Sequence, residues 1–197
     1  MGGFQIDRLG RDAVQLLNHL EIKTDAFCGL SVGGLVGQWL GLKAPDRITK
    51  LVLCNTAAQI GNLEAWNVRI DTVNKGGLAA ISDGVLERWF TPAFHQREPE
   101  TVRRFRKVLE STRPESYVAT SAAIRDADFQ NQVSKIRSET LVIAGTHDKS
   151  TPPEAGRYLA HQIPNSKYVE LNAAHLSNVE LTQPFLEEIL RFVNNEQ

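Results

Sequence analysis

The spacing of apolar and polar positions changes along the chain, and the changes predict a mixed α/β protein. Apolar residues recur with helical spacing over residues 7–20 and again over residues 35–42. Short apolar runs within residues 25–30 and 48–55 predict buried strands on either side of the second helix. A strand, a helix and a strand within so short a span predict a parallel crossover.

The middle of the chain has a different pattern. From about residue 57 to about residue 132, helical segments are broken by NKGGL, TPAFH and TRPES. Strand character returns at residues 139–145 and 167–171, and an amphipathic helix is predicted at residues 184–193. The order of elements predicts an α/β core, built from residues 1–56 and 133–197, that is interrupted by a helical cap at residues 57–132.

Composition narrows the classes of function. The 197 residues include 22 Lys and Arg against 23 Asp and Glu, interspersed along the chain, which argues against a nucleic-acid partner. No uncharged apolar run approaches the roughly 20 residues of a membrane helix, and no signal-peptide pattern opens the chain. We therefore expect a cytoplasmic protein with a small-molecule partner and no membrane partner. Cys28 and Cys54 lack metal-ligand spacing and are expected to be small buried hydrophobic residues.

Ser31 stands in the sequence Gly-Leu-Ser-Val-Gly, between the first predicted strand and the helix after it. If the strand reverses directly into the helix, residues near the turn must be small, and Gly29 and Gly33 meet that need. Such a turn exposes a serine hydroxyl beside the backbone N–H groups of a helix start, where an oxyanion could form. The alternative is a glycine-rich turn that only packs closely or cradles a phosphate, but no nucleotide-binding glycine pattern is in register. The strand–turn–helix context favours a nucleophile.

A nucleophilic serine needs a base, and the base needs an acid to orient it. His175 follows a predicted strand in a loop of small residues and is favoured as the base. Asp148 follows another buried strand and is favoured as the acid, because the other strand end that can supply one carries Asn55, an amide without charge. The remaining histidines lie in helical patterns, in the cap or directly before that aspartate: His19, His161, His95 and His147.

A family resemblance is carried by FCGLSVGGLVGQWLGLKAPDRITKLVLCNTA, AGTHDKSTPP and AAHLSN. These segments resemble the 3-oxoadipate enol-lactonases of the α/β-hydrolase superfamily, and the resemblance runs essentially end to end. It implies an α/β-hydrolase fold and hydrolysis of 3-oxoadipate enol-lactone to 3-oxoadipate, in bacterial degradation of aromatic compounds, without a metal or organic cofactor. By position, Ser31 would attack the lactone carbonyl, His175 would carry its proton and Asp148 would orient the imidazole. The Val32 N–H would form half of the oxyanion hole, and Trp66 would wall the substrate pocket.

The chain departs from this family at its start. Full-length members begin with further residues that carry the first strands of the sheet and an HG loop, which donates the second oxyanion N–H. We therefore expect an α/β-hydrolase fold that lacks the N-terminal strands, with residues 25–30 as an exposed apolar edge through which the chain could form a homo-oligomer. The alternatives are a truncated gene model, a fragment completed by an N-terminal partner, and a shortened, non-catalytic protein.

Substrate choice also stays open at this point. Relatives of the fold include other carboxylic-ester hydrolases and perhydrolases, and cap residues set that choice. Dehalogenases of this fold use aspartate as the nucleophile, so Ser31 argues against that branch. The carboxylate of an enol-lactone calls for a cation, and Arg69, Arg125 or another arginine could supply it.

Overall fold

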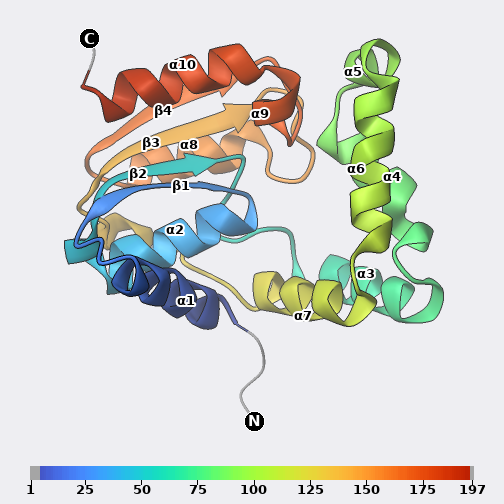
Figure 1. Ribbon diagram of the computed structural model, residues 1–197, viewed down its shortest axis with the longest axis horizontal. Coiled ribbons are helices and arrows are strands. Elements are labelled where there is room, and N and C mark those ends of the chain that lie inside the picture. The colour runs from blue at the N-terminus through green and yellow to red at the C-terminus, as the bar shows by residue number, and fades with distance from the viewer. Residues whose placement is uncertain (1–4, 196–197) are drawn as a thin grey trace.

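In the computed structural model, which describes residues 5–195, four parallel strands form one sheet flanked by helices (Figure 1). The strands lie side by side in chain order: β1 (Asp25–Leu30), β2 (Ile48–Cys54), β3 (Glu139–Gly145) and β4 (Ser166–Leu171). Each neighbouring pair is parallel, which confirms the predicted crossovers. All four carboxyl ends therefore meet at one edge of the sheet.

Helices cover both faces of the sheet, as an α/β-hydrolase fold requires. One face is covered by α2 (Val32–Lys43) and α8 (Pro153–Gln162), and α1 (Ile6–His19) packs on the outer side of α2. The other face is covered by α10 (Thr182–Val193), whose apolar side packs against the sheet. Short helical turns complete the core: η1 (Pro45–Arg47), η2 (Val133–Lys135) and α9 (Ser177–Glu180).

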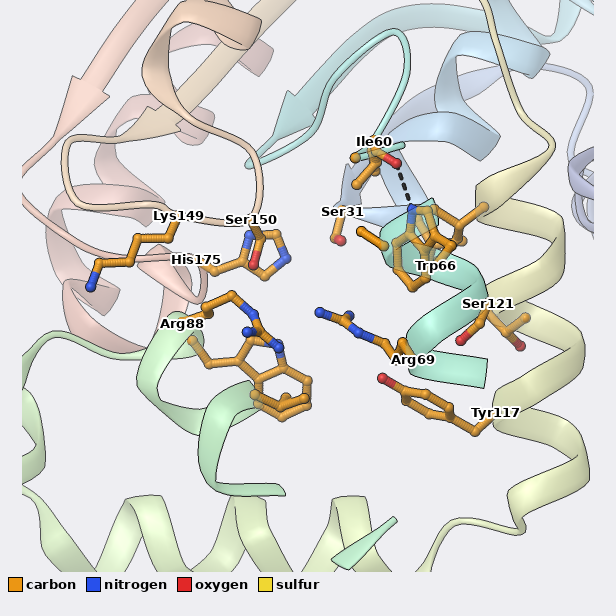
Figure 2. A pocket seen from close by; sticks show the side chains of 17 residues that line it. Ser31, Ile60, Trp66, Arg69, Arg88, Tyr117, Ser121, Lys149, Ser150 and His175 are labelled. Carbon is orange, nitrogen blue, oxygen red and sulfur yellow. Dashed lines mark hydrogen bonds between the residues drawn. The ribbon is translucent and has the colours of Figure 1, made fainter. Parts of the chain in front are cut away.

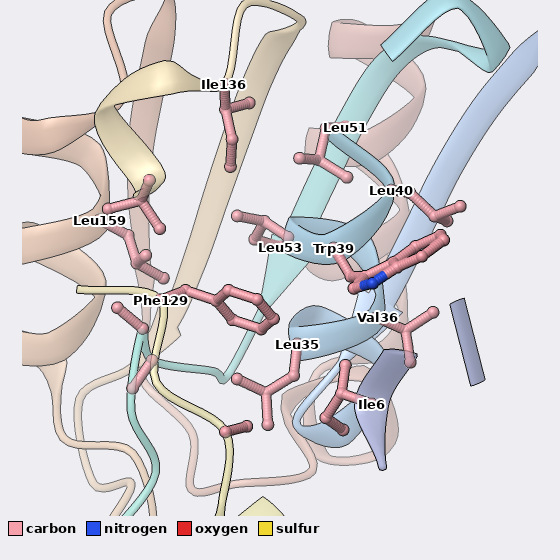
Figure 3. Packing of buried hydrophobic residues seen from close by; sticks show 14 of the residues in the cluster. Ile6, Leu35, Val36, Trp39, Leu40, Leu51, Leu53, Phe129, Ile136 and Leu159 are labelled. Carbon is pink, nitrogen blue, oxygen red and sulfur yellow. The ribbon is translucent and has the colours of Figure 1, made fainter. Parts of the chain in front are cut away.

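Alternation along β2 explains the two cores. Leu51 and Leu53 are fully buried against α2 (Figure 3), whereas Val52 and Cys54 are buried against the other face with Phe185 of α10. Successive side chains of a strand point to opposite faces, so a strand covered on both faces reads as a continuous apolar run. This geometry is the reason that residues 51–54 form an unbroken apolar run.

The cap consists of helices inserted between β2 and β3: α3 (Leu63–Gly76), α4 (Ala79–Trp89), α5 (Pro92–Arg97), α6 (Pro99–Ser111) and α7 (Pro114–Arg125). These helices lie beyond the carboxyl ends of the strands (Figure 1). Prolines at the first helical position begin three of them, where the missing N–H costs no hydrogen bond. The helices fall within the predicted cap, whose limits at residues 57 and 132 stay a prediction.

β1 is the edge strand of the described sheet and pairs there with β2 alone. Cys28 on β1 is exposed, so the expectation that it is buried is wrong, while Cys54 is buried as expected. The two Sγ atoms lie 3.9 Å apart across the strand pair. Self-association through this edge stays a prediction. Within residues 5–195, no helix combines the length and the hydropathy needed to cross a membrane.

The turn from β1 into α2 is held tight by close backbone contacts. A Cβ atom added to Gly29 would lie 2.1 Å from the carbonyl oxygen of Gly33, and one added to Gly34 would lie 2.5 Å from the Thr56 side chain. A Cβ atom on Gly33 would meet nothing within 4 Å. The expectation that the turn requires a small residue is therefore confirmed for Gly29 and wrong for Gly33, which contributes only its backbone oxygen to the contact. The second position that requires a small residue is Gly34.

Exchange of Gly29 for alanine tests this contact. We expect Gly29→Ala to lower the free energy of unfolding by at least about 1–3 kcal/mol, the usual cost of overpacking. Gly33→Ala is the matched control, and it should be neutral or stabilise by up to about 1 kcal/mol, because alanine favours a helix over glycine. Urea denaturation followed by circular dichroism measures both. Equal losses in the two variants would contradict the assignment of the contact to Gly29.

Candidate active site

Ser31 joins β1 to α2 in a backbone conformation that residues other than glycine rarely adopt. Its φ is 57° and its ψ is −115°. Such a conformation costs roughly 1–3 kcal/mol and persists only where the surroundings hold it. The Ser31 N–H donates to the Cys54 carbonyl at 2.9 Å, and the Thr56 hydroxyl donates to the Ser31 carbonyl at 2.8 Å. The predicted strained strand–turn–helix context of the serine is therefore confirmed.

His175 and Asp148 form a buried pair beside this turn. The distance from His175 Nδ1 to Asp148 Oδ2 is 2.8 Å, and the residues are only 4% and 3% exposed. Asp148 follows β3 and His175 follows β4, which are neighbours in the sheet. A carboxylate in this position fixes the orientation and tautomer of an imidazole and leaves Nε2 available for a second partner.

Asp148 accepts hydrogen bonds on both of its carboxylate oxygens. Oδ1 accepts from the N–H groups of Ser150 and Thr151 at 2.8 and 3.0 Å, and Oδ2 accepts from the Thr151 hydroxyl at 2.7 Å and from Asn55 Nδ2 at 3.0 Å. Burial by itself would raise the pKa of Asp148. The hydrogen bond and charge of His175, followed by the contacts from Thr151 and Asn55, outweigh burial and lower the pKa below its usual value. The carboxyl is therefore ionised at neutral pH.

Asn55 supports this pair from the end of β2. Its φ is 43°, and it is 1% exposed. Besides its bond to Asp148, its amide donates to the Ala174 carbonyl at 3.2 Å and accepts from the Ser177 hydroxyl at 2.6 Å. An amide can donate to a buried carboxylate, whereas a second carboxylate would repel it. Sequence reasoning set Asn55 aside as an acid and missed this supporting role.

A cavity of about 370 Å³ brings Ser31 and His175 together between the strand ends and the cap (Figure 2). Its size lies in the range of small-molecule sites. The Ser31 hydroxyl makes no hydrogen bond to His175, and the two side chains instead share the cavity wall. Catalytic hydrogen bonds are often long in the absence of substrate and shorten when it binds.

Positive charge lines the cap side of the cavity. Arg69 of α3 and Arg88 of α4 face it from opposite walls, and neither forms an ion pair with a described residue. Burial, and then the positive charge of Arg69, lower the pKa of Arg88, and the opposing influence of Tyr117 and Glu87 does not offset them. Lys149, in the loop after β3, also lines the cavity, but its side chain points away from Ser31 (Figure 2). Arg125, the other arginine that the sequence suggested, pairs with Asp126 and does not line the cavity.

Two further predicted residues lie at the cavity. Val32 is the first residue of α2 and lines the wall beside Ser31. The Trp66 indole also lines the cavity, where its Nε1 donates to the Ile60 carbonyl at 2.6 Å and the Arg69 guanidinium lies 4.8 Å from its ring centroid. Trp66 is thus fixed by the core and in turn supports the arginine.

The other histidines lie away from this cavity. His19 and His161 are exposed on helices, His147 contacts Asn172, and His95 contacts the Leu86 carbonyl. Within residues 5–195, no group of three or more His, Cys, Asp or Glu residues is placed to hold a metal ion. Sequence reasoning missed Arg88 and Lys149, since a charge in an amphipathic cap helix or a loop gives no sign of the direction it faces.

Comparisons with known proteins agree with this fold. Residues 2–180 match the model of the alpha/beta hydrolase fold family. The chain is 40% identical over 185 residues to 3-oxoadipate enol-lactonase 2 of Acinetobacter baylyi, covering 94% of this chain and 69% of that protein. It superposes on the enol-lactonase of Burkholderia xenovorans LB400 with a TM-score of 0.96 and 39% identity, covering 98% of this chain and 75% of that one. A malate-bound thermophilic esterase of Thermogutta terrifontis has a TM-score of 0.91 at 26% identity, covering 98% and 74%.

The fold and the family match together define a hydrolase of carboxylic esters or lactones with the α/β-hydrolase architecture. Within that class, the chain belongs to the 3-oxoadipate enol-lactonase family.

Exchange of Asp148 for asparagine tests the buried pair. Asp148→Asn removes the charge that stabilises the imidazolium and favours the wrong tautomer of His175, so we expect kcat for ester hydrolysis to fall by a factor on the order of 10⁴. Asp126→Asn is the matched control, because Asp126 pairs with Arg125 at the surface; it should leave kcat within about twofold. Steady-state rates with p-nitrophenyl acetate, at a temperature where both variants are folded, give the comparison. Similar kcat values for the wild-type protein and Asp148→Asn would exclude Asp148 as the acid.

Proposed function

We propose that this protein hydrolyses 3-oxoadipate enol-lactone to 3-oxoadipate through an acyl-enzyme. The observation that carries the proposal is the buried His175–Asp148 pair, with its 2.8 Å contact, at the wall of the cavity that also holds Ser31 and two unpaired arginines. The enol-lactonase relative at 40% identity supports this substrate. No step of this chemistry calls for a metal or an organic cofactor.

The proposed reaction has two steps, acylation of Ser31 and hydrolysis of the acyl-enzyme. Ser31 Oγ attacks the lactone carbonyl while His175 Nε2 takes the hydroxyl proton, and Asp148 stabilises the imidazolium that forms. Collapse of the tetrahedral intermediate breaks the ring C–O bond, and the imidazolium protonates the leaving enolate, which becomes the ketone. Water, deprotonated by His175, then releases the acyl group from Ser31. The Val32 N–H would stabilise the oxyanion of both steps, a contribution on the order of 3 kcal/mol for one donor.

The cap would select a negatively charged substrate. An enol-lactone that carries a carboxylate brings one negative charge into a cavity whose cap walls hold Arg69 and Arg88. Guanidinium groups bind carboxylates through paired, charge-assisted hydrogen bonds. Trp66 would offer a flat apolar wall to the ring, on the side of Arg69. The carboxylate would thus point toward the cap, and the lactone carbonyl toward Ser31.

A second candidate is hydrolysis of another carboxylic ester, or perhydrolysis, by the same residues. The malate-bound esterase at 26% identity favours the first of these, because its ligand also carries carboxylates. The chemistry at Ser31 would be the same in each case, and only the group held by the cap would differ.

Exchange of Ser31 for alanine tests the proposed reaction. The wild-type protein should consume synthetic 3-oxoadipate enol-lactone, followed by loss of its ultraviolet absorbance, and Ser31→Ala should reduce kcat by a factor on the order of 10⁶. Ser150→Ala is the matched control at the same cavity, and it should retain kcat within about tenfold. Unchanged turnover in Ser31→Ala would contradict the proposed nucleophile. Ester hydrolysis without lactone hydrolysis by the wild-type protein would favour the second candidate.

Exchange of the arginines tests the carboxylate subsite. We expect Arg69→Gln and Arg88→Gln each to raise KM for the lactone by roughly 10-fold to 100-fold, the value of a hydrogen bond to a charged group. KM for the neutral ester p-nitrophenyl acetate should stay within about threefold. Arg125→Gln, outside the cavity, is the control and should change neither KM. Equal increases in KM for both substrates would show that the arginines shape the cavity and do not bind the substrate carboxylate.

A further inference from the structure

Glu180 is a buried carboxylate that the proposed reaction does not use. It is the last residue of α9 and is only 8% exposed. Its Oε1 accepts from the N–H and the hydroxyl of Thr91 at 2.8 and 2.7 Å, and its Oε2 accepts from the N–H of Ala174. Burying a carboxylate is costly unless hydrogen bonds compensate for the water that it loses. These three donors supply that compensation.

The donors of Glu180 come from two different parts of the protein. Ala174 is the residue before His175, in the loop after β4. Thr91 lies in the cap, where it caps the first turn of α5 by accepting from the Phe94 N–H at 3.2 Å. Glu180 therefore ties the backbone next to His175 to the joint between α4 and α5.

A second bond fixes the histidine loop from its other side. The N–H of Leu176, the residue after His175, donates to the Trp89 carbonyl at 3.0 Å. Leu176 also packs against a cap cluster that includes Phe90 and Phe94. The backbone on both sides of His175 is thus attached to residues 89–91 of the cap, one attachment being direct and the other passing through Glu180.

The same cap segment forms part of the cavity wall. Arg88 and Trp89, in the last turn of α4, line the cavity that holds Ser31 and His175. Any shift of residues 88–91 would therefore move the cationic wall and the imidazole together. Displacement of a catalytic group by about 1 Å is enough to cost roughly 100-fold in rate.

We propose that Glu180 is a positioning residue, which couples the cap wall at residues 88–91 to the imidazole of His175. An acceptor-only carboxylate suits this position, because both of its oxygens face donors. A glutamine would turn an NH₂ group toward either Ala174 or Thr91 and leave an N–H without an acceptor. The coupling does not depend on the identity of the substrate. Only the measurements with the lactone, in the experiment below, rest on the proposed function.

The experiment compares four variants with two substrates. Glu180→Gln removes the acceptor pattern with little change in shape, and Glu187→Gln, on the exposed side of α10, is the control for charge. Thr91→Val removes the hydroxyl donor from the cap side, and Thr91→Ser retains it. For each variant, kcat and KM are measured with p-nitrophenyl acetate and with 3-oxoadipate enol-lactone, at least 15 °C below the thermal midpoint of that variant, so that folded protein is compared with folded protein.

We expect Glu180→Gln to lower kcat for both substrates by about 10-fold to 100-fold, with KM for the ester within about twofold. Thr91→Val should lower kcat by about 3-fold to 10-fold, Thr91→Ser should restore it, and Glu187→Gln should change nothing. A lowered thermal midpoint with unchanged kcat in Glu180→Gln would overturn the proposal, because it would show a role in stability alone. If Glu180→Gln does not fold, unequal kcat values for Thr91→Val and Thr91→Ser support the coupling, and equal values overturn it. A wild-type protein that cleaves the ester and not the lactone contradicts the proposed substrate and leaves the ester comparison as the test of Glu180.

Discussion

The structure depends on one constraint, which is that all four strands are parallel and end at the same edge of the sheet. Residues far apart in the chain are therefore delivered to one place. Ser31 follows β1, Asn55 follows β2, Asp148 follows β3 and His175 follows β4. Because both faces of the sheet are covered, the loops at this edge rest on a rigid support, and a few residues after each strand suffice to set the direction of each side chain.

Burial of the site has a cost in free energy, and it also fixes the positions of the side chains. A buried carboxylate at Asp148 would be unstable alone, and the surrounding loops supply donors from Ser150, Thr151 and Asn55. The same donors leave the carboxylate a single orientation, so the imidazole of His175 has one preferred position. The compensation for burial and the alignment of the pair are therefore the same set of hydrogen bonds.

Much of this site could be predicted from sequence, because its elements obey local rules. Ser31 lies between an apolar run and a helical pattern, and the strained turn follows from that junction. Asp148 and His175 each follow a predicted strand, and parallel topology alone brings strand ends together. Gly33 shows the limit of this reasoning, since a glycine in a motif does not reveal which atom approaches it. The roles of Arg88, Asn55 and Glu180 were missed because they come from tertiary contacts between segments that are far apart in the sequence.

The core and the cap contribute different physical properties to the site. Core loops provide groups whose positions are fixed by burial and hydrogen bonds, whereas the cap provides unpaired cations and an apolar wall. The positive charge of Arg69 disfavours the charge of Arg88, and a carboxylate bound by both arginines would offset that repulsion. Such binding would favour the cap position seen here, and the bonds through Trp89, Thr91 and Glu180 would transmit the same position to the histidine loop. In the proposed function, binding of the carboxylate by the cap and alignment of His175 in the core would thus be two effects of one binding event.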